Sequence, residues 1–219
     1  MARASTPRRA DPSPPEPPES DATASELVGG ERSLDLTFAD LDLTGAELAH
    51  TELVRCRLER VRMSAATLRG ARLVDVVLLD CELSGTGAAE STWKRVELTR
   101  CRATGLDLHD AELSHVRFHD VKLDTANVRF ARCDHTVFED SVLVEADFTE
   151  ATLDAVDMHQ CDLTRLDLTK VRATDVDLRR STVEGLRGVA GLGGVTVGAD
   201  QVIPYAVSVF AEIGVRIGD

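Results

Sequence analysis

The side chains that could do chemistry in this chain are its 38 acidic residues, six histidines and five cysteines. The cysteines show no CxxC pair and no Cys/His spacing typical of a metal site. His115 and His135 lie four repeats of five apart and could share a metal only if the fold stacked them, and no third ligand is evident. A nucleophile–base set and a phosphate-binding loop are also missing from the sequence. We therefore predict a non-enzymatic protein without a catalytic, cofactor or metal site.

A strict register of five organises most of the chain. Its central column begins at Phe38 and takes every fifth residue to Val183, which makes 30 repeats without insertion or deletion. A second column of apolar or small residues stands two positions earlier in each repeat, from Leu36 to Ser181. None of these 60 positions is charged, although 29% of the chain is charged. The two columns predict an interior, and the other three positions predict a surface.

A period of five fits neither a helix face nor the alternation of a strand. Short fixed periods are typical of solenoids, in which each unit buries its apolar side by stacking on its neighbours. Two inward residues in five suit a chain that turns a corner once in each repeat, and four corners close a square coil. Thirty repeats then make about 7.5 coils, and a spacing of ~4.8 Å between stacked strands gives a rod about 36 Å long.

The repeats resemble those of the pentapeptide-repeat proteins, in which a small residue, a polar residue, Leu or Phe and two polar residues follow one another. Clear examples are ADFTE at residues 146–150, AELSH at 111–115 and CDLTR at 161–165. The resemblance covers about 150 of the 219 residues. It implies an all-β solenoid, namely a right-handed quadrilateral β-helix, which we place at residues 31–188.

The segments on either side of the repeats differ in composition. Residues 1–30 hold six of the seven prolines among polar residues, and such a stretch buries too little apolar surface to order itself. We predict a disordered tail there, with a docking segment as the alternative. The tail lacks the apolar core of an export signal, and no stretch is long enough to span a membrane. Together with the odd number of cysteines, this predicts a reducing, cytoplasmic location.

Several packing details follow from the columns. Four cysteines occupy the small inward column, and Cys133 occupies a central position. We therefore predict that the cysteines are buried, pack as small hydrophobic side chains and form no disulfides. Phe118 and Phe138 should stack as an aromatic ladder. Trp93 is oversized for its position, and we predict that it fills the volume left by nearby alanines. A binding notch at this irregular coil is the alternative.

The register ends after Gly188, and residues 189–219 form the third predicted segment. Residues 194–197 resemble a short strand. Residues 200–213 predict an amphipathic helix, with Asp200 as its N-cap. Its apolar stripe consists of Ile203, Ala206, Val207, Phe210 and Ile213. We expect this stripe to cap the last coil, because a solenoid end exposes its core. In gyrase-binding members of the family the C-terminal region joins two rods, so the resemblance also implies a homodimer through this segment.

The outward residues fall into two kinds of column. Some alternate in sign from one coil to the next, such as Asp40, Arg60, Asp80 and Arg100, and we interpret these as stacking devices. The side of the rod centred on Leu48, Leu68, Ala88, Leu108, Val128, Phe148 and Leu168 is instead mostly acidic, and we call it the acidic face. There Asp147 lies over Asp167 and Glu90 over Asp110, which places like charges together without an evident structural purpose.

An acidic surface around an exposed aromatic ring is a reasonable site for a protein partner. The predicted partner site consists of Glu90, Asp107, Asp110, Phe130, Asp147, Glu150 and Asp167. An ordinary solvated surface is the alternative reading of the same residues.

Two functions are compatible with these features. Gyrase-binding pentapeptide-repeat proteins are acidic dimeric rods that mimic duplex DNA, and the chain resembles them. The resemblance is closer to the uninterrupted mycobacterial type than to the plasmid-borne type, whose repeats are broken by long loops. Residues 37–185 hold 28 acids and 19 bases, which gives a net charge of −9 over about 36 Å, or about one charge per 4 Å. DNA carries one charge per ~1.7 Å of its axis, so the rod as a whole is less than half as densely charged as DNA. The alternative is a general interaction scaffold unrelated to topoisomerase. Neither function predicts direct binding to nucleic acid or to a membrane.

Overall fold

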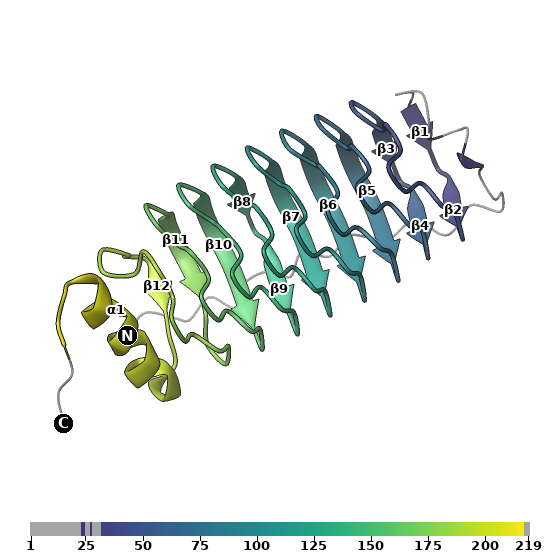
Figure 1. The fold of residues 1–219 in the computed structure, drawn as a ribbon. Coiled ribbons are helices and arrows are strands. Elements are labelled where there is room, and N and C mark those ends of the chain that lie inside the picture. Colours follow the sequence, from purple (N-terminus) through teal and green to yellow (C-terminus); the bar gives the residue numbers. More distant parts are fainter. Residues whose placement is uncertain (1–22, 25–26, 28–31, 217–219) are drawn as a thin grey trace, which may run out of the picture.

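The computed structural model describes residues 23–24, 27 and 32–216, and these form a rod closed at one end by a helix (Figure 1). The predicted tail, residues 1–30, lies outside the described residues except for Thr23, Ala24 and Leu27. Leu27 is buried in the core at the N-terminal end of the rod. Among the described helices, none is long and apolar enough to cross a membrane.

The described strands belong to one parallel sheet that winds around the rod. They are β1 (Arg32–Leu34), β2 (Thr37–Ala39), β3 (Glu52–Val54), β4 (Arg57–Glu59), β5 (Arg72–Leu79), β6 (Thr92–Thr99), β7 (Glu112–His119), β8 (Arg132–Asp134), β9 (Val137–Glu139), β10 (Thr152–His159), β11 (Arg172–Asp177) and β12 (Val195–Thr196). They line two sides of the coil. On the other two sides, single parallel bridges such as Asp147 to Asp167 join successive coils.

Stacking follows an interval of four repeats. Leu58 pairs with Leu78, and Phe118 pairs with Phe138. The right-handed quadrilateral β-helix predicted from the register of five is therefore confirmed. Among the described strands, the interval shortens by one position only at β12, where Val176 pairs with Val195, because the chain after Gly188 no longer follows the repeat.

The interior contains the two predicted columns. All five cysteines are free and buried, as expected. The rings of Phe118 and Phe138 stack with centroids 4.7 Å apart and planes 4° apart. Trp93 is 1% exposed and lies in the same core as the fully buried Ala88 and Ala103, so the ring fills space instead of bordering a notch. Each large apolar side chain buried in this way stabilises the fold by about 1.5–3 kcal/mol.

The corners of the coil place many non-glycine residues in the left-handed conformation. The last residue of most repeats has a φ near +55°, as at Asp40, Asp80 and Arg100, where a non-glycine residue is strained. Backbone hydrogen bonds offset this strain, because the corner N–H donates to the next coil, as from Asp80 to the Thr99 carbonyl at 3.0 Å.

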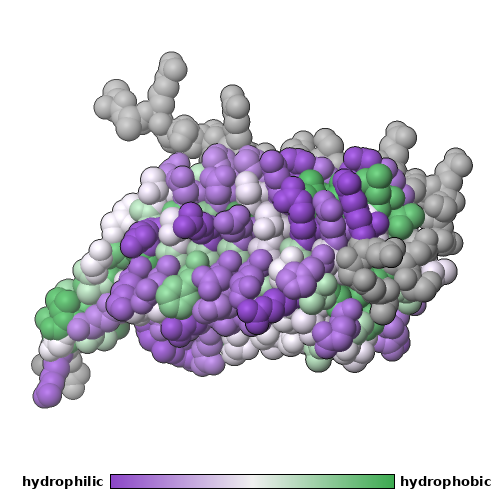
Figure 2. All heavy atoms as spheres, turned by 90° about the horizontal axis from the view of Figure 1, so that it is seen from above, coloured by the Kyte–Doolittle hydropathy of each residue, from purple (hydrophilic) through white to green (hydrophobic). Residues whose placement is uncertain are grey.

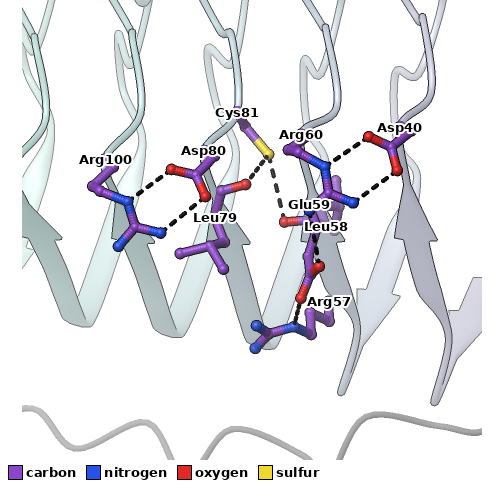
Figure 3. A network of polar contacts seen from close by, with 9 residues as sticks. All are labelled: Asp40, Arg57, Leu58, Glu59, Arg60, Leu79, Asp80, Cys81 and Arg100. Carbon is purple, nitrogen blue, oxygen red and sulfur yellow. Dashed lines mark hydrogen bonds and ion pairs between the residues drawn. The ribbon is translucent and has the colours of Figure 1, made fainter.

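Charged ladders follow the corners (Figure 3). Arg60 donates two hydrogen bonds to Asp40, both of 2.7 Å, and Arg100 donates two to Asp80, of 2.8 and 2.9 Å. These side chains are about half exposed, so each pair adds little to stability and is screened by salt. The predicted stacking role of the alternating columns is confirmed for these pairs, whereas Glu82 binds the backbone N–H of Ser84 instead of an arginine above or below it.

The C-terminal end differs from its prediction. A short 3-10 helix, η2 (Ala199–Gln201), leads into α1 (Val202–Glu212). Asp200 lies inside η2 and does not cap α1, whose N-cap position is Gln201 without a side-chain hydrogen bond. The expectation that the apolar stripe covers the last coil was wrong for its four larger members. Their exposed fractions are 76% for Ile203, 46% for Val207, 39% for Phe210 and 58% for Ile213.

Polar groups, together with the apolar side chains of Tyr205 and Val209, hold α1 against the last coil in place of that stripe. Gln201 is 3% exposed, and its Nε2 donates to the carbonyls of Leu178 and Ser181 at 2.7 and 2.6 Å. Glu212 accepts hydrogen bonds from the backbone N–H groups of residues 188–190. These contacts satisfy backbone groups that a solenoid end leaves open, and they fix α1 with its apolar stripe facing outward.

Candidate partner-binding face

The acidic face presents its predicted residues in two neighbouring columns. Asp107, Asp147 and Asp167 belong to a bridge column that continues through Asn127 to Arg187. The remaining predicted residues, Glu90, Asp110, Phe130 and Glu150, stand in the adjoining corner column, where each has a φ of 56–61°. The coil thus brings residues as distant in the sequence as Glu90 and Asp167 onto one side of the rod.

The aspartates of the bridge column have a structural role that we did not expect. Asp147 accepts a hydrogen bond from the backbone N–H of Thr149 at 2.8 Å, and Asp167 accepts one from Thr169 at 2.9 Å. Asn127 makes the same contact to Arg129, at 3.3 Å, from the same column. Each side chain therefore stabilises its own turn. The interpretation of these stacked carboxylates as lacking a structural purpose was wrong.

Bases neutralise much of the acidic face. The Arg129 guanidinium lies 3.3 Å from the Asp147 carboxylate, and Lys170 Nζ lies 3.0 Å from Glu150. Arg69 pairs with Glu90, and Arg187 lies 3.6 Å from Asp167. Arg187 falls beyond the last complete repeat, so its contribution was missed, although it stands one full coil after Asp167. Asp107 and Asp110 have contacts of another kind.

These two aspartates are bound by an amide, a backbone N–H and a histidine. Asp107 accepts hydrogen bonds from Asn127 Nδ2 at 2.8 Å and from the backbone of His109 at 3.1 Å. Asp110 lies 3.1 Å from Nε2 of His109. Neither carboxylate has a lysine or arginine within ion-pair distance among the described residues. The strongest uncompensated negative charge of the face therefore lies around residues 107–110.

The electrostatics of Asp147 are set by competing contacts. Partial burial raises the pKa of its carboxyl, but hydrogen bonds from Thr149 and the charge of Arg129 outweigh burial and hold the pKa below its ordinary value. Asp147 is therefore ionised at neutral pH. A face that binds basic groups needs carboxylates in this state.

Phe130 supplies the apolar part of the site. Its side chain is 38% exposed. The His109 ring meets it edge-on, with centroids 5.3 Å apart, and the Arg129 guanidinium carbon lies 5.6 Å from its centroid. These neighbours hold the ring in place while leaving part of it open to a partner. Aromatic residues held in this way are frequent energetic centres of protein interfaces.

The stacked histidines form a polar cluster on a different side. The rings of His115 and His135 lie 4.9 Å apart and 3° from parallel, as expected from their spacing. Ser114 Oγ lies 3.0 Å from His115 Nδ1, and Asp134 lies 2.7 Å from His135 Nδ1. The carboxylate thus orients the histidine that does not touch the serine, so the cluster lacks the relay that nucleophilic catalysis requires.

One group of possible metal ligands was missed in the sequence. Asp157, His159 and Asp177 bring their ligand atoms within 4.8 Å of one another. Asp157 and Asp177 stand one coil apart on the outer side of β10 and β11, in a column for which we predicted no site from the sequence. The stacking interval itself was the signal that could have found this group.

The fold and the face together define a class: a closed β-solenoid whose distinctive surfaces are an acidic side and an apolar terminal helix. The model for the pentapeptide repeat region matches residues 51–128, 72–148 and 111–187. These matches extend over more than half of the chain, which therefore belongs to the pentapeptide-repeat family.

Solved structures agree with this assignment at the level of the fold. Two trypsin-treated variants of QnrB1, a plasmid-mediated fluoroquinolone resistance protein, are similar to this chain with TM-scores of 0.58 and 0.55 and identities of 22% and 21%. Each alignment covers 88% of this chain and 92% of the other. No catalytic family is indicated by these comparisons, and curated proteins gave no significant match to the chain.

Proposed function

We propose that this chain is a non-enzymatic, dimeric rod that binds DNA gyrase through its acidic face, as a mimic of duplex DNA. The observation that carries the proposal is the arrangement of the acidic face, where carboxylates recur along two columns around the partly exposed ring of Phe130. The likeness to gyrase-binding pentapeptide-repeat proteins supplies the identity of the partner. The lowered pKa of Asp147 supports the proposal, because a DNA mimic must present ionised groups.

A dimer is supported by the exposed surface of α1. Figure 2 shows hydrophobic residues at the C-terminal end of a mostly hydrophilic rod, on the left, as well as at its other end. The large apolar side chains exposed at the C-terminal end are Val202, Ile203, Val207, Phe210, Ile213 and Val215. A second copy of the chain is the occupant we propose, because two rods joined at these ends form one longer acidic rod. Light scattering should give about twice the chain mass of 23.7 kDa, and Phe210→Glu should halve that value.

A gyrase supercoiling assay tests the proposed partner. Asp147→Asn and Asp167→Asn together remove two charges, while Asn127 shows that asparagine preserves the turn at this position. We expect the double variant to inhibit supercoiling about tenfold more weakly, a change of about 1.4 kcal/mol in binding. Absence of any effect of the wild-type protein at micromolar concentration would eliminate gyrase as the partner.

A matched control removes the same charge from another side of the rod. Asp42 and Asp162 bind the N–H groups of Thr44 and Thr164 in the same way, and they stand in a different bridge column. Replacing both with asparagine should leave inhibition unchanged. An equal loss in both double variants would mean that net charge matters and that the acidic face is not the site.

A general interaction scaffold is the second candidate. It is favoured by the ion pairs of Arg69, Arg129, Lys170 and Arg187, which neutralise part of the acidic face and make it a poorer copy of DNA. Under this function the wild-type protein leaves supercoiling unaffected, while Phe130 and its surroundings still bind another protein.

We also infer a cytoplasmic setting, supported by five buried cysteines that are all in the thiol form.

A further inference from the structure

A small polar cluster lies on the outer side of the sheet near the C-terminal end of the rod. Asp157 and His159 are two residues apart on β10, so their side chains emerge on the same side of the strand. Asp177 on β11 stands directly opposite Asp157 in the parallel register. His159 Nε2 lies 3.6 Å from Asp157 Oδ1 and 3.8 Å from Asp177 Oδ2. Two neighbouring coils thus direct three ligand atoms toward one point.

Asp157 is unusual among the charged residues of this chain. With 7% exposure, it is the one charged residue that is buried among those described. His159 is the only basic group within ion-pair distance of its carboxylate in the described part of the chain, and 3.6 Å is too long for a hydrogen bond. A buried carboxylate beside another carboxylate calls for a compensating cation.

The distances fit the coordination of a small metal ion. In a regular tetrahedron the distance between two ligands is about 1.63 times the metal–ligand distance. Ligand separations of 3.6 and 3.8 Å therefore correspond to metal–ligand distances of about 2.2–2.3 Å, close to the 2.0–2.2 Å of zinc with histidine and carboxylate ligands. All three ligand atoms lie within 4.8 Å of one another, so the side chains have to close around the ion to complete the geometry.

We propose that Asp157, His159 and Asp177 form a binding site for a divalent transition-metal cation, with Zn²⁺ as the best fit. One imidazole nitrogen and two carboxylate oxygens suit zinc, cobalt or manganese better than calcium, which takes six to eight oxygen ligands. Three protein ligands leave a fourth position for water. The ion would connect β10 to β11 and so stabilise the coil next to the C-terminal end.

Arg179 competes with the metal for one ligand. Its Nε lies 2.9 Å from both carboxylate oxygens of Asp177, so the guanidinium now balances part of the charge of the cluster. The side chain of Arg179 is 54% exposed and can move into solvent when a cation binds. Removing this positive charge should therefore strengthen metal binding, a result that an ion-pair cluster without a metal site would not give.

The experiment uses the full chain without a histidine tag. EDTA first removes bound metal, and the EDTA itself is then removed by dialysis. Titration calorimetry with ZnCl₂ should show one equivalent bound, and Co²⁺ should give the visible absorption of a tetrahedral site. His159→Gln should weaken binding at least about tenfold, and Arg179→Gln should strengthen it. His119→Gln is the matched control, because His119 occupies the same outward position two coils earlier, near Glu139 and Asp140, and should bind as the wild type does.

Circular dichroism must show that each variant remains folded, because unfolding exposes thiols that bind zinc. If His159→Gln does not fold, NMR of the wild type replaces it, and zinc should shift one imidazole among the six. Absence of saturable binding would overturn the proposal. So would wild-type affinity in His159→Gln, or an equal loss in His119→Gln.

Discussion

The replacement of Phe138 by alanine tests whether the aromatic ladder stabilises the rod. Phe138 is 2% exposed, stacks on Phe118 at 4.7 Å and meets the ring of Phe148 edge-on at 6.2 Å. Removing a buried Phe side chain from a core costs about 3–5 kcal/mol, and the loss of two ring contacts places this site in the upper part of that range. We expect Phe138→Ala to lower the free energy of unfolding by roughly 4–5 kcal/mol.

Urea unfolding followed by far-UV circular dichroism measures this change, and Phe130→Ala provides the matched control. Phe130 is 38% exposed, so its loss should lower the free energy of unfolding by about 1 kcal/mol while weakening any partner binding. If the free energy of unfolding depends less steeply on urea concentration in Phe138→Ala alone, the solenoid unfolds in parts. A loss below about 2 kcal/mol at Phe138, or equal losses at both positions, would refute the view of the rod as one densely packed core.

Three further predictions concern the C-terminal end and the charges. Gln201→Ala leaves backbone groups of the last coil without partners and should lower the free energy of unfolding by roughly 2–4 kcal/mol, with faster amide exchange in β11 and β12. In metal-free protein, Asp157→Asn should raise the melting temperature at neutral pH, because the raised pKa of Asp157 means that its stabilising contribution is lost as the pH rises through that pKa. Carboxyls with a lowered pKa, such as Asp80 and Asp147, affect the pH dependence of stability in the opposite direction. Their contribution is present above about pH 4 and is lost as the pH falls through the folded pKa, so acid titration should show a falling melting temperature below about pH 4.

The interior of this protein and the winding of its coils can be predicted from the sequence. The register of five repeats 30 times without interruption, so a single assumption about the corners assigns every repeat to a side of the rod. That is why the stacking of Phe118 on Phe138, the burial of the cysteines and the pairing of Arg60 with Asp40 could all be predicted. Each of these contacts follows from the period and the four corners of a coil.

The arrangement in space is needed to learn what happens where the repeat ends and where outward side chains choose among neighbours. An amphipathic pattern reveals that α1 has an apolar stripe, but it does not reveal which side of the helix meets the rod. Gln201 and Glu212 bind backbone groups of the last coil, and Tyr205 and Val209 pack against the core. Together these contacts fix the orientation of α1 and leave Ile203 and Phe210 exposed. Similarly, Asp147 has a threonine N–H, an arginine and another aspartate nearby, and only the geometry selects its partners. Apolar burial follows a pattern because it is nondirectional, whereas hydrogen bonds and ion pairs depend on distances that a linear pattern does not contain.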